Sequence, residues 1–353
     1  MATSNKSNKS NKSNKSNKSN KSGLDDDELS AVGEDSSLTL SDALQSALLA
    51  FKKPPVPALS PAAVRAPDEL LFRRLNARHR QHLIVQALGQ GLAVTDMAPG
   101  ASLIRKAELA VGGTARLDLM LDLTDVGFWQ GQIAELVSMK WHRDDRMSEI
   151  VLQQTDILSF MTLGLPIAAD THPWTLALLD AAQEVAFRVA TDFKAIFQMP
   201  RPHEMSPDVV PIIRTPAHSA FPSGHATEAF AAATVLAALF PDRAGHLRLM
   251  AARIAMNRSF AGVHCVVEHH AGAILGDLLG GIIVKRALGQ TIWAGPGGKA
   301  SFTTGVKPAL NPPMASNVET YATIMVPLNV SATVPEPVSG VLGHLAARVR
   351  SEF

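Results

Sequence analysis

The chain has 353 residues, of which 46% are hydrophobic, and a formal net charge of +1 at pH 7. This length and apolar content suffice for one large domain, or two ordinary ones, with a buried core. Cys265 is the only cysteine, which excludes an intrachain disulfide and a cysteine-ligated metal site and gives no sign of an oxidising compartment.

The N-terminal region is of low complexity. Residues 4–21 repeat Ser-Asn-Lys six times, and four acidic residues occupy positions 25–28. The repeat has no apolar residue to bury, and no apolar stretch follows it. Residues 1–36 are therefore predicted to form a disordered tail rather than a signal peptide, although the repeat could still hold polyanions weakly. Outside the six Ser-Asn-Lys repeats, the chain has 27 basic against 32 acidic residues. This mild negative charge argues against a nucleic-acid partner.

Residues 37–66 are expected to hold a short helix, 41–52, and a proline-rich linker. Residues 67–290 follow as one catalytic domain dominated by helical spacing. We predict helices over 69–88, 116–140, 146–160, 173–197, 225–240, 244–260 and 267–288. Pro173 suits a helix start, and the prolines at 200 and 202 should end that helix.

Residues 291–353 are predicted to form an irregular extension, with an extended stretch at 322–334 and a last helix at 338–350. The longest apolar runs, 229–240 and 271–284, fall short of the roughly 20 residues that a membrane-spanning helix needs. We therefore expect a soluble, cytoplasmic protein without a transmembrane segment.

Three cations and two histidines lie within a short stretch of this domain: Lys194, Arg201, Arg258, His225 and His264. Arginine forks and a lysine point charge suit a tetrahedral oxyanion such as a phosphoryl group or vanadate. The two imidazoles then have natural roles as nucleophile and as acid/base. The pattern indicates an oxyanion site.

Two local arrangements support this site. The turn Pro222-Ser223-Gly224-His225 opens a helix, where Gly224 allows close approach of an anion, the Ser223 hydroxyl can donate, and the first N–H groups are unpaired. Glu268 lies one helical turn beyond His264 and can accept its Nδ1–H, which leaves Nε2 free. A metal cluster with His269 and His270 is not expected, because consecutive helical residues point about 100° apart.

These segments resemble the superfamily of type 2 phosphatidic acid phosphatases, bacterial acid phosphatases and vanadium-dependent haloperoxidases. The pattern of that superfamily is Lys-x6-Arg-Pro, Pro-Ser-Gly-His and Ser-Arg-x5-His-x3-Asp. This chain has Lys194-x6-Arg201-Pro202, Pro222 to His225, and Asn257-Arg258-x5-His264-x3-Glu268. The resemblance covers about residues 190–285 and implies an all-α helical bundle. Asn257 in place of serine and Glu268 in place of aspartate are the two departures.

For a phosphatase, the resemblance implies that His264 attacks phosphorus to form a phosphohistidine and that His225 protonates the leaving alcohol. Lys194, Arg201, Arg258 and the Ser223-Gly224 amides would hold the transferring oxygens. The substrate would be a small-molecule phosphoester, and neither metal nor cofactor would be needed. The loop at 204–216 and the upstream helices are expected to line the pocket.

For a haloperoxidase, the resemblance implies that vanadate is held on His264 as the cofactor, that hydrogen peroxide and halide are the substrates, and that His225 is the acid/base. Arg258 follows His225 by only 33 residues, a compact spacing that favours the phosphatase. His218 and the sequence Gly262-Val263-His264 resemble the corresponding segments of algal bromoperoxidases, so this alternative stays open. A third possibility is a non-catalytic anion-binding or scaffold protein in which Glu268 marks lost catalysis. Phosphoester hydrolysis is the main prediction.

Overall fold

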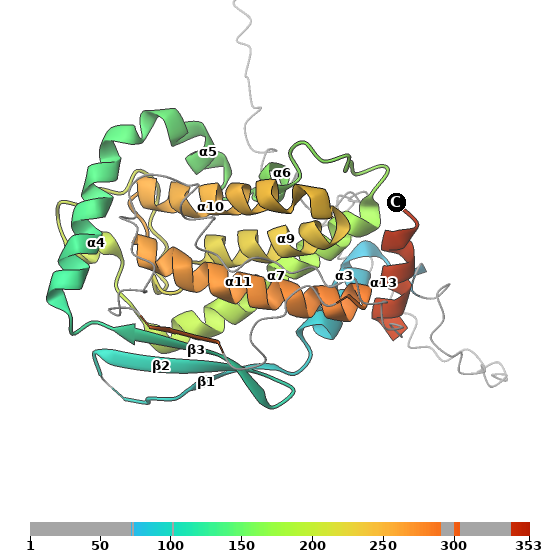
Figure 1. The fold of residues 1–353 in the computed structure, drawn as a ribbon, viewed down its shortest axis with the longest axis horizontal. Coiled ribbons are helices and arrows are strands. Elements are labelled where there is room, and N and C mark those ends of the chain that lie inside the picture. Colours follow the sequence, from blue (N-terminus) through green and yellow to red (C-terminus); the bar gives the residue numbers. More distant parts are fainter. Residues whose placement is uncertain (1–71, 73, 101, 291–299, 304–339) are drawn as a thin grey trace, which may run out of the picture. The chain divides into compact units, whose positions relative to one another are not determined.

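The computed structural model describes residues 72, 74–100, 102–290, 300–303 and 340–353 (Figure 1). The chain divides into two units, residues 1–62 and 63–353, and every described residue belongs to the second. The predicted tail at 1–36, the predicted helix and linker at 37–66, and the predicted extended stretch at 322–334 therefore lie outside the described residues.

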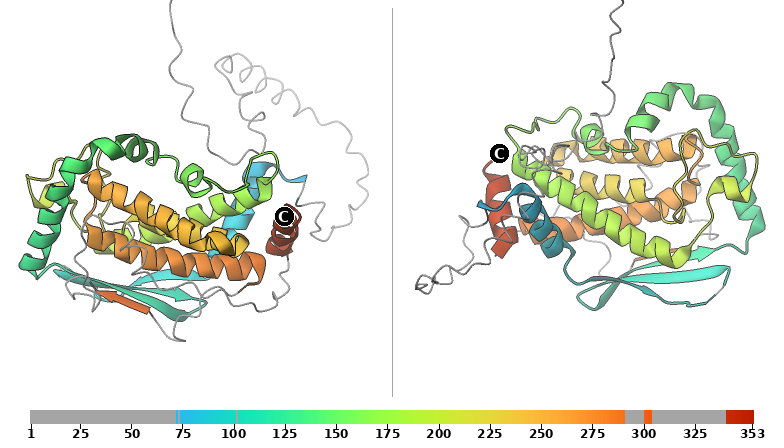
Figure 2. Two further views of the ribbon diagram at one scale, coloured as in Figure 1. Left: turned by 45° about the horizontal axis from the view of Figure 1, so that its top comes forward. Right: turned by 180° about the vertical axis from the view of Figure 1, so that it is seen from behind.

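Four helices form the centre of a mainly helical fold: α7 (Pro173–Phe197), α9 (Gly224–Leu239), α10 (Ala244–Phe260) and α11 (Val266–Leu288). Each agrees with its predicted range to within one residue. Helix α9 contacts the other three (Figures 1 and 2), and most of its side chains are buried, as expected for a helix that is apolar all round. None of the helices in the described part is long and apolar enough to cross a membrane.

Close packing fixes the start of α9 against α11. A Cβ added at Gly272 of α11 would lie 2.5 Å from the Ser223 carbonyl oxygen, so only glycine allows this approach. Farther along, both Asp277 carboxylate oxygens accept bonds of 3.0 Å from Arg248 of α10, and Thr234 of α9 donates to the same carboxylate. This buried, satisfied pair joins α9, α10 and α11.

A sheet packs below the helices and was not predicted. Strands β1 (Leu92–Asp96), β2 (Ile104–Val111) and β3 (Thr114–Asp122) run antiparallel, and β4 (Ala300–Thr303) pairs parallel to β3. The predicted helix over 116–140 is thus wrong in its first part, and only α4 (Val126–Met139) is helical. Leu117, Leu119 and Leu121 alternate toward the core, where they join a cluster with residues of α7 and α11, the pattern of a half-buried strand.

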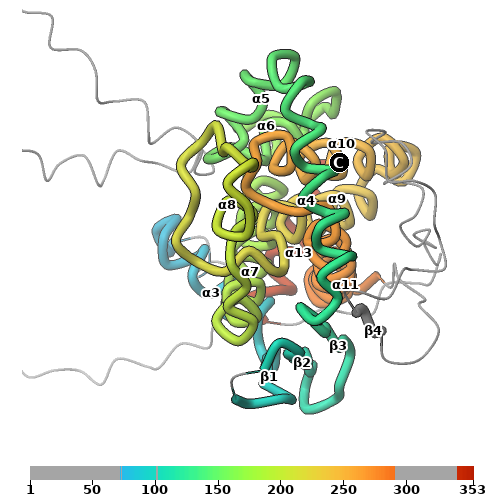
Figure 3. The backbone as a smooth tube through the Cα atoms, turned by 90° about the vertical axis from the view of Figure 1, so that its left-hand side faces the viewer, coloured from blue at the N-terminus to red at the C-terminus, as the bar shows by residue number. Residues whose placement is uncertain are grey.

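The remaining helices surround this core. Helix α3 (Ala77–Gly89) covers much of the predicted 69–88, whereas the predicted helix 146–160 is two short helices, α5 (Met147–Leu152) and α6 (Leu158–Met161). Helix α4 leads from the sheet toward α5 (Figure 3). The predicted last helix is present as α13 (Gly340–Arg350), packed on α3, α7 and α11. Single turns occur at α8 (Pro202–Met205), η2 (Lys140–His142), η3 (Asp144–Arg146) and η4 (Pro241–Arg243).

Candidate functional site

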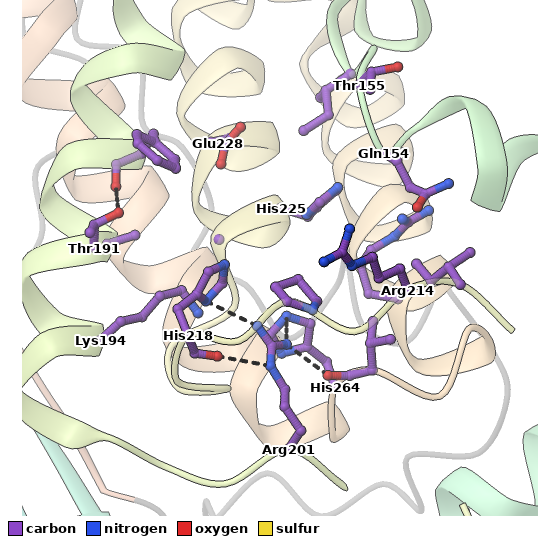
Figure 4. A pocket seen from close by; sticks show the side chains of 18 of the residues that line it. Gln154, Thr155, Thr191, Lys194, Arg201, Arg214, His218, His225, Glu228 and His264 are labelled. Carbon is purple, nitrogen blue, oxygen red and sulfur yellow. Dashed lines mark hydrogen bonds between the residues drawn. The ribbon is translucent and has the colours of Figure 1, made fainter. Parts of the chain in front are cut away.

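All three predicted cations and both histidines line one cavity of about 350 Å³ (Figure 4). They are Lys194 at the end of α7, Arg201 just after it, His225 at the start of α9, Arg258 near the end of α10, and His264 before α11. The cations are only 1–5% exposed. Buried like charges are costly unless a counter-charge neutralises them. Three buried cations in one cavity therefore favour a bound anion.

Hydrogen bonds fix the tautomer of His264. Its Nδ1 bonds the buried Glu268 carboxylate, and Nη1 of Arg201 lies 3.0 Å from its Nε2. A guanidinium can only donate, so Nε2 carries the lone pair and Nδ1 the proton. Burial and the nearby Arg201 lower the pKa of His264 well below its usual value. The imidazole is thus neutral, with its Nε2 lone pair accepting from Arg201 and its Nδ1 bonded to Glu268, the contact that the spacing of these two residues predicted.

Arg258 lines the same cavity and has N–H donors that remain available to a ligand. Its Nη2 donates to the Ile150 carbonyl at 2.8 Å and lies 3.5 Å from Oε1 of Gln153. Its Nε and Nη1 have no hydrogen-bond partner among the described residues, although both are buried. Buried polar groups nearly always have a partner. These N–H groups fit the oxygens of a phosphoryl group or of vanadate.

Lys194 adds a point charge beside the first turn of α9. Its Nζ donates to the carbonyls of Ser219 at 2.8 Å and Ala220 at 3.4 Å. Burial and the neighbouring Arg201 lower the pKa of Lys194 to about 7, against the attraction of Glu268 and Glu228. An anion in the cavity would favour the charged ammonium and raise this pKa again.

The first turn of α9 contributes Gly224 to the cavity, whereas Ser223 does not line it. The buried Ser223 acts as the N-cap, accepting from the Ala226 N–H at 3.5 Å, and its own N–H donates to the Glu268 carbonyl at 3.0 Å. The first N–H groups of a helix have no intrahelical acceptor. Gly224 and His225 therefore offer the helix terminus to an anion, and Ser223 holds the turn in place.

His225 is placed as a proton acceptor. Its Nε2 lies 2.9 Å from the Gln153 carbonyl, which can only accept, so Nε2 carries the proton and Nδ1 the lone pair. Burial and the charge of Arg258 lower the pKa of His225 to about 3. The ring is therefore neutral in the free site.

His218 lies at the rim of the cavity, next to Arg201. Nη2 of Arg201 is 3.1 Å from its Nδ1, and Nε of Arg201 donates to its carbonyl at 3.1 Å. Arg201 thus links His218 to His264. Behind His264, His269 bonds the Ser259 hydroxyl at 2.9 Å, and no group of three potential metal ligands occurs among the described residues.

Sequence reasoning missed part of the cavity wall. Gln154, Thr155 and Glu228 line it, as does Arg214, which belongs to the loop at 204–216 that was expected there. Glu228 lies three residues after His225 on the same helix face, a spacing that could have indicated it. Residues 147–157, called the wall segment below, gave no such signal because tertiary contacts place them.

Asn257, the first departure from the family pattern, holds the wall segment. Its Nδ2 donates to Oε2 of Glu149 and to Oε1 of Gln153, each at 2.9 Å. Its Oδ1 accepts from Arg146 at 3.0 Å. A serine hydroxyl is too small to make all three bonds, so the exchange ties α5 to α10.

The PAP2 superfamily model matches residues 173–291, which hold every residue of the oxyanion cradle. One similar solved structure is a bacterial vanadium-dependent iodoperoxidase, at 16% identity and a TM-score of 0.34, over 42% of this chain and 48% of that one. Another is a transmembrane PAP2-type phosphatidylglycerolphosphate phosphatase from Bacillus subtilis, at 18% identity and a TM-score of 0.34, over 46% of this chain and 86% of that one. This chain thus spans about half the length of the iodoperoxidase. No curated protein matches.

Proposed function

We propose that this chain, whose residues 173–291 match the PAP2 superfamily model, hydrolyses a small-molecule phosphoester through a phosphohistidine on His264. One observation carries this proposal. His264, Arg201 and Arg258 line one cavity: Arg201 donates to Nε2 of His264 at 3.0 Å, and two buried N–H groups of Arg258 have no hydrogen-bond partner among the described residues. A bound phosphoryl oxygen would accept from Arg201 in place of Nε2 and free the lone pair of His264. A nucleophile and its oxyanion cradle therefore share one small space.

The first half of the reaction transfers the phosphoryl group to the protein. Nε2 of His264 forms a bond to phosphorus while the ester P–O bond breaks, and the alcohol oxygen takes a proton from His225, whose protonated form is favoured by the charge of the bound phosphoester. Arg258, Lys194 and the first N–H groups of α9 stabilise the charge on the transferring oxygens. Glu268 keeps the proton on Nδ1 and stabilises the imidazolium that develops.

The second half returns His264 to its free state. Water attacks phosphorus on the side that the alcohol left, the bond from phosphorus to Nε2 of His264 breaks, and Nδ1 of His225 accepts a proton from the water. The bound phosphoryl anion offsets the charge of Arg258, which raises the basicity of His225 above its value in the free site. Phosphate then leaves.

One observation favours a second candidate, a vanadium-dependent haloperoxidase: Arg201 joins His218 to His264 at the cavity floor. The unpaired donors of Arg258 fit vanadate as well as phosphate. His264, Lys194, Arg201 and Arg258 would hold it. Bound vanadate would supply the activation of hydrogen peroxide toward a halide.

Two assays on the same preparation separate these functions. Hydrolysis of para-nitrophenyl phosphate in chelator-treated buffer is measured beside bromination of a phenol indicator with vanadate and peroxide. We expect hydrolysis, and its loss in His264→Ala. Bromination without hydrolysis would overturn the phosphatase in favour of the second candidate.

A further inference from the structure

The cavity is larger than its oxyanion cradle. Its volume of about 350 Å³ lies in the range of sites for small molecules, so a phosphoryl group on the cradle leaves part of it open to the leaving group. The loop between α8 and α9 lines another side through Ile213, Arg214 and Pro216. Figure 4 shows Arg214 across the cavity from Lys194, with His225 between them. This loop is therefore in a position to contact the leaving group.

Backbone contacts hold this loop against the core. The N–H of Ile212 donates to the Ala261 carbonyl at 3.0 Å, and the Ile212 side chain packs against the hydrophobic core. A Cβ added at Gly262 would lie 3.2 Å from Cα of Pro211, so the loop is packed directly on the turn between α10 and α11. The backbone at Arg214, two residues after Ile212, is therefore held close to the cavity.

Arg214 differs from the other cations of the cavity because no described residue binds it. Lys194 and Arg258 donate to backbone carbonyls, whereas the exposed Arg214 forms no hydrogen bond or ion pair with any residue that the structure describes. A guanidinium presents a planar fork of N–H donors that matches two oxygens of a carboxylate or of a phosphate. These donors are available to a substrate.

The positive charges that line the cavity exceed what one phosphoryl group can balance. Among the described residues, the lining has four basic side chains and one carboxyl group: Lys194, Arg201, Arg214, Arg258 and Glu228. A phosphate monoester carries about two negative charges at neutral pH, so positive charge remains when it is bound. Charge complementarity selects among ligands that otherwise fit. A substrate with a second anionic group therefore matches this cavity better than one with a neutral leaving group.

We propose that Arg214 binds a second anionic group on the leaving group, so that the preferred substrates are small phosphoesters that also carry a carboxylate or another phosphate. This inference rests on the proposed phosphatase function. Arg214 determines specificity and takes no part in the transfer of the phosphoryl group, which stays with His264 and the cradle. Its contribution should therefore appear mainly in KM, as for any interaction that is equally strong in the ground state and in the transition state.

Matched pairs of substrates test this role. Phosphate esters of ω-hydroxy acids of increasing chain length are compared with those of the corresponding ω-hydroxy amides, which have the same size but no second charge. Bisphosphates of the corresponding diols, set beside the monophosphates, show whether the second anion is a carboxylate or a phosphate. Arg214→Gln removes the charge, and Arg214→Lys keeps it without the fork. Arg243→Gln is the matched control, because Arg243 is also exposed but lies at the start of α10 and does not line the cavity.

We expect the wild type to hydrolyse the doubly charged ester of at least one chain length with a kcat/KM roughly tenfold above that of its neutral counterpart, the factor that one charge-assisted contact supplies. Arg214→Gln should remove this preference by raising KM for the doubly charged ester, and Arg214→Lys should retain part of it. Arg243→Gln should keep it in full. Added salt should weaken the preference of the wild type, because the Arg214 side chain is exposed.

Equal kcat/KM for charged and neutral esters at every chain length, or a preference that persists in Arg214→Gln, would overturn the role of Arg214, while hydrolysis of these esters would leave the phosphatase function in place. If Arg214→Gln does not fold, the same comparison in the wild type and in Arg214→Lys decides instead. A wild-type protein that hydrolyses none of the esters would overturn the phosphatase function and this inference together.

Discussion

The floor and the wall of the cavity are built in different ways. The floor consists of Lys194, Arg201, Arg258 and His264, on or next to long buried helices, and short bonds to backbone carbonyls hold its cations. The wall segment has only short helices and is tied to α10 by polar side chains such as Glu149, which bonds Arg253 at 2.8 Å. The rigid floor suits any tetrahedral anion. Selection among substrates is therefore expected to depend on the wall segment.

The largest expected effect comes from removing the nucleophile on the floor. His264→Ala should lower kcat by on the order of 10⁴-fold or more, because no other group can take its place in the phosphoryl transfer. Sulfate binding should remain measurable, since the cations stay. Steady-state hydrolysis and calorimetry give the two values. Activity above about one hundredth of the wild type would contradict the role of His264.

Arg258 and Arg253 allow a matched comparison of floor and wall on one helix. Arg258→Ala removes the unpaired donors of the cavity and should lower kcat by about 10²- to 10³-fold. Arg253→Ala removes the partner of Glu149 and should change kcat far less. Similar losses of kcat in both variants would show that the floor is no more important for catalysis than the wall segment.

Proton uptake should accompany anion binding to the floor. Below the free-site pKa of Lys194, about 7, the ammonium is already charged, so sulfate affinity should be flat. Above it, sulfate must bind together with a proton, and affinity should fall by up to about tenfold per pH unit. Calorimetry in buffers of different ionisation enthalpy measures the uptake.

Two variants separate the titrating groups in that experiment. Lys194→Met should bind sulfate more weakly and lose the onset near pH 7. Burial raises the pKa of the Glu228 carboxyl group to about 8. Glu228→Gln should therefore lose only the fall in sulfate affinity that begins near this pH. Sulfate affinity that does not change with pH in the wild type would contradict the electrostatic description of the floor.

The smallest effect is expected in the wall. Asn257→Ala removes bonds to Glu149, Gln153 and Arg146 and should lower the free energy of unfolding by about 1–3 kcal/mol. KM for a phosphoester should rise severalfold while sulfate affinity stays the same. Urea unfolding and steady-state kinetics measure both. A parallel loss of sulfate affinity would mean that the wall also shapes the floor.

The central helices were predictable because their ends are marked in the sequence. Pro173 opens α7, Pro200 and Pro202 follow its end, and Gly289 in the left-handed region ends α11. The superfamily motifs lie on these helices. The order and spacing of these motifs were therefore enough to predict that the three cations and two histidines lie together in one site.

The sheet and the wall were not predicted, for two different physical reasons. The alternation of Leu117, Leu119 and Leu121 was available in the sequence but was interpreted with a helical period. The place of Gln153, by contrast, depends on its bond to Asn257, 104 residues away, and no local pattern encodes that contact. Likewise, the turn before His225 predicted the start of a helix but could not reveal that Ser223 does not line the cavity.

The most direct test of the account is detection of the covalent intermediate. The protein is mixed with para-nitrophenyl phosphate, quenched rapidly in alkali, which preserves phosphohistidine, and digested for mass spectrometry. The account predicts one added phosphoryl group on the peptide that contains His264, and more of it in His225→Ala, where attack by water is slowed. A hydrolysing protein with no phosphoryl group on His264, or with one on another residue, would contradict it.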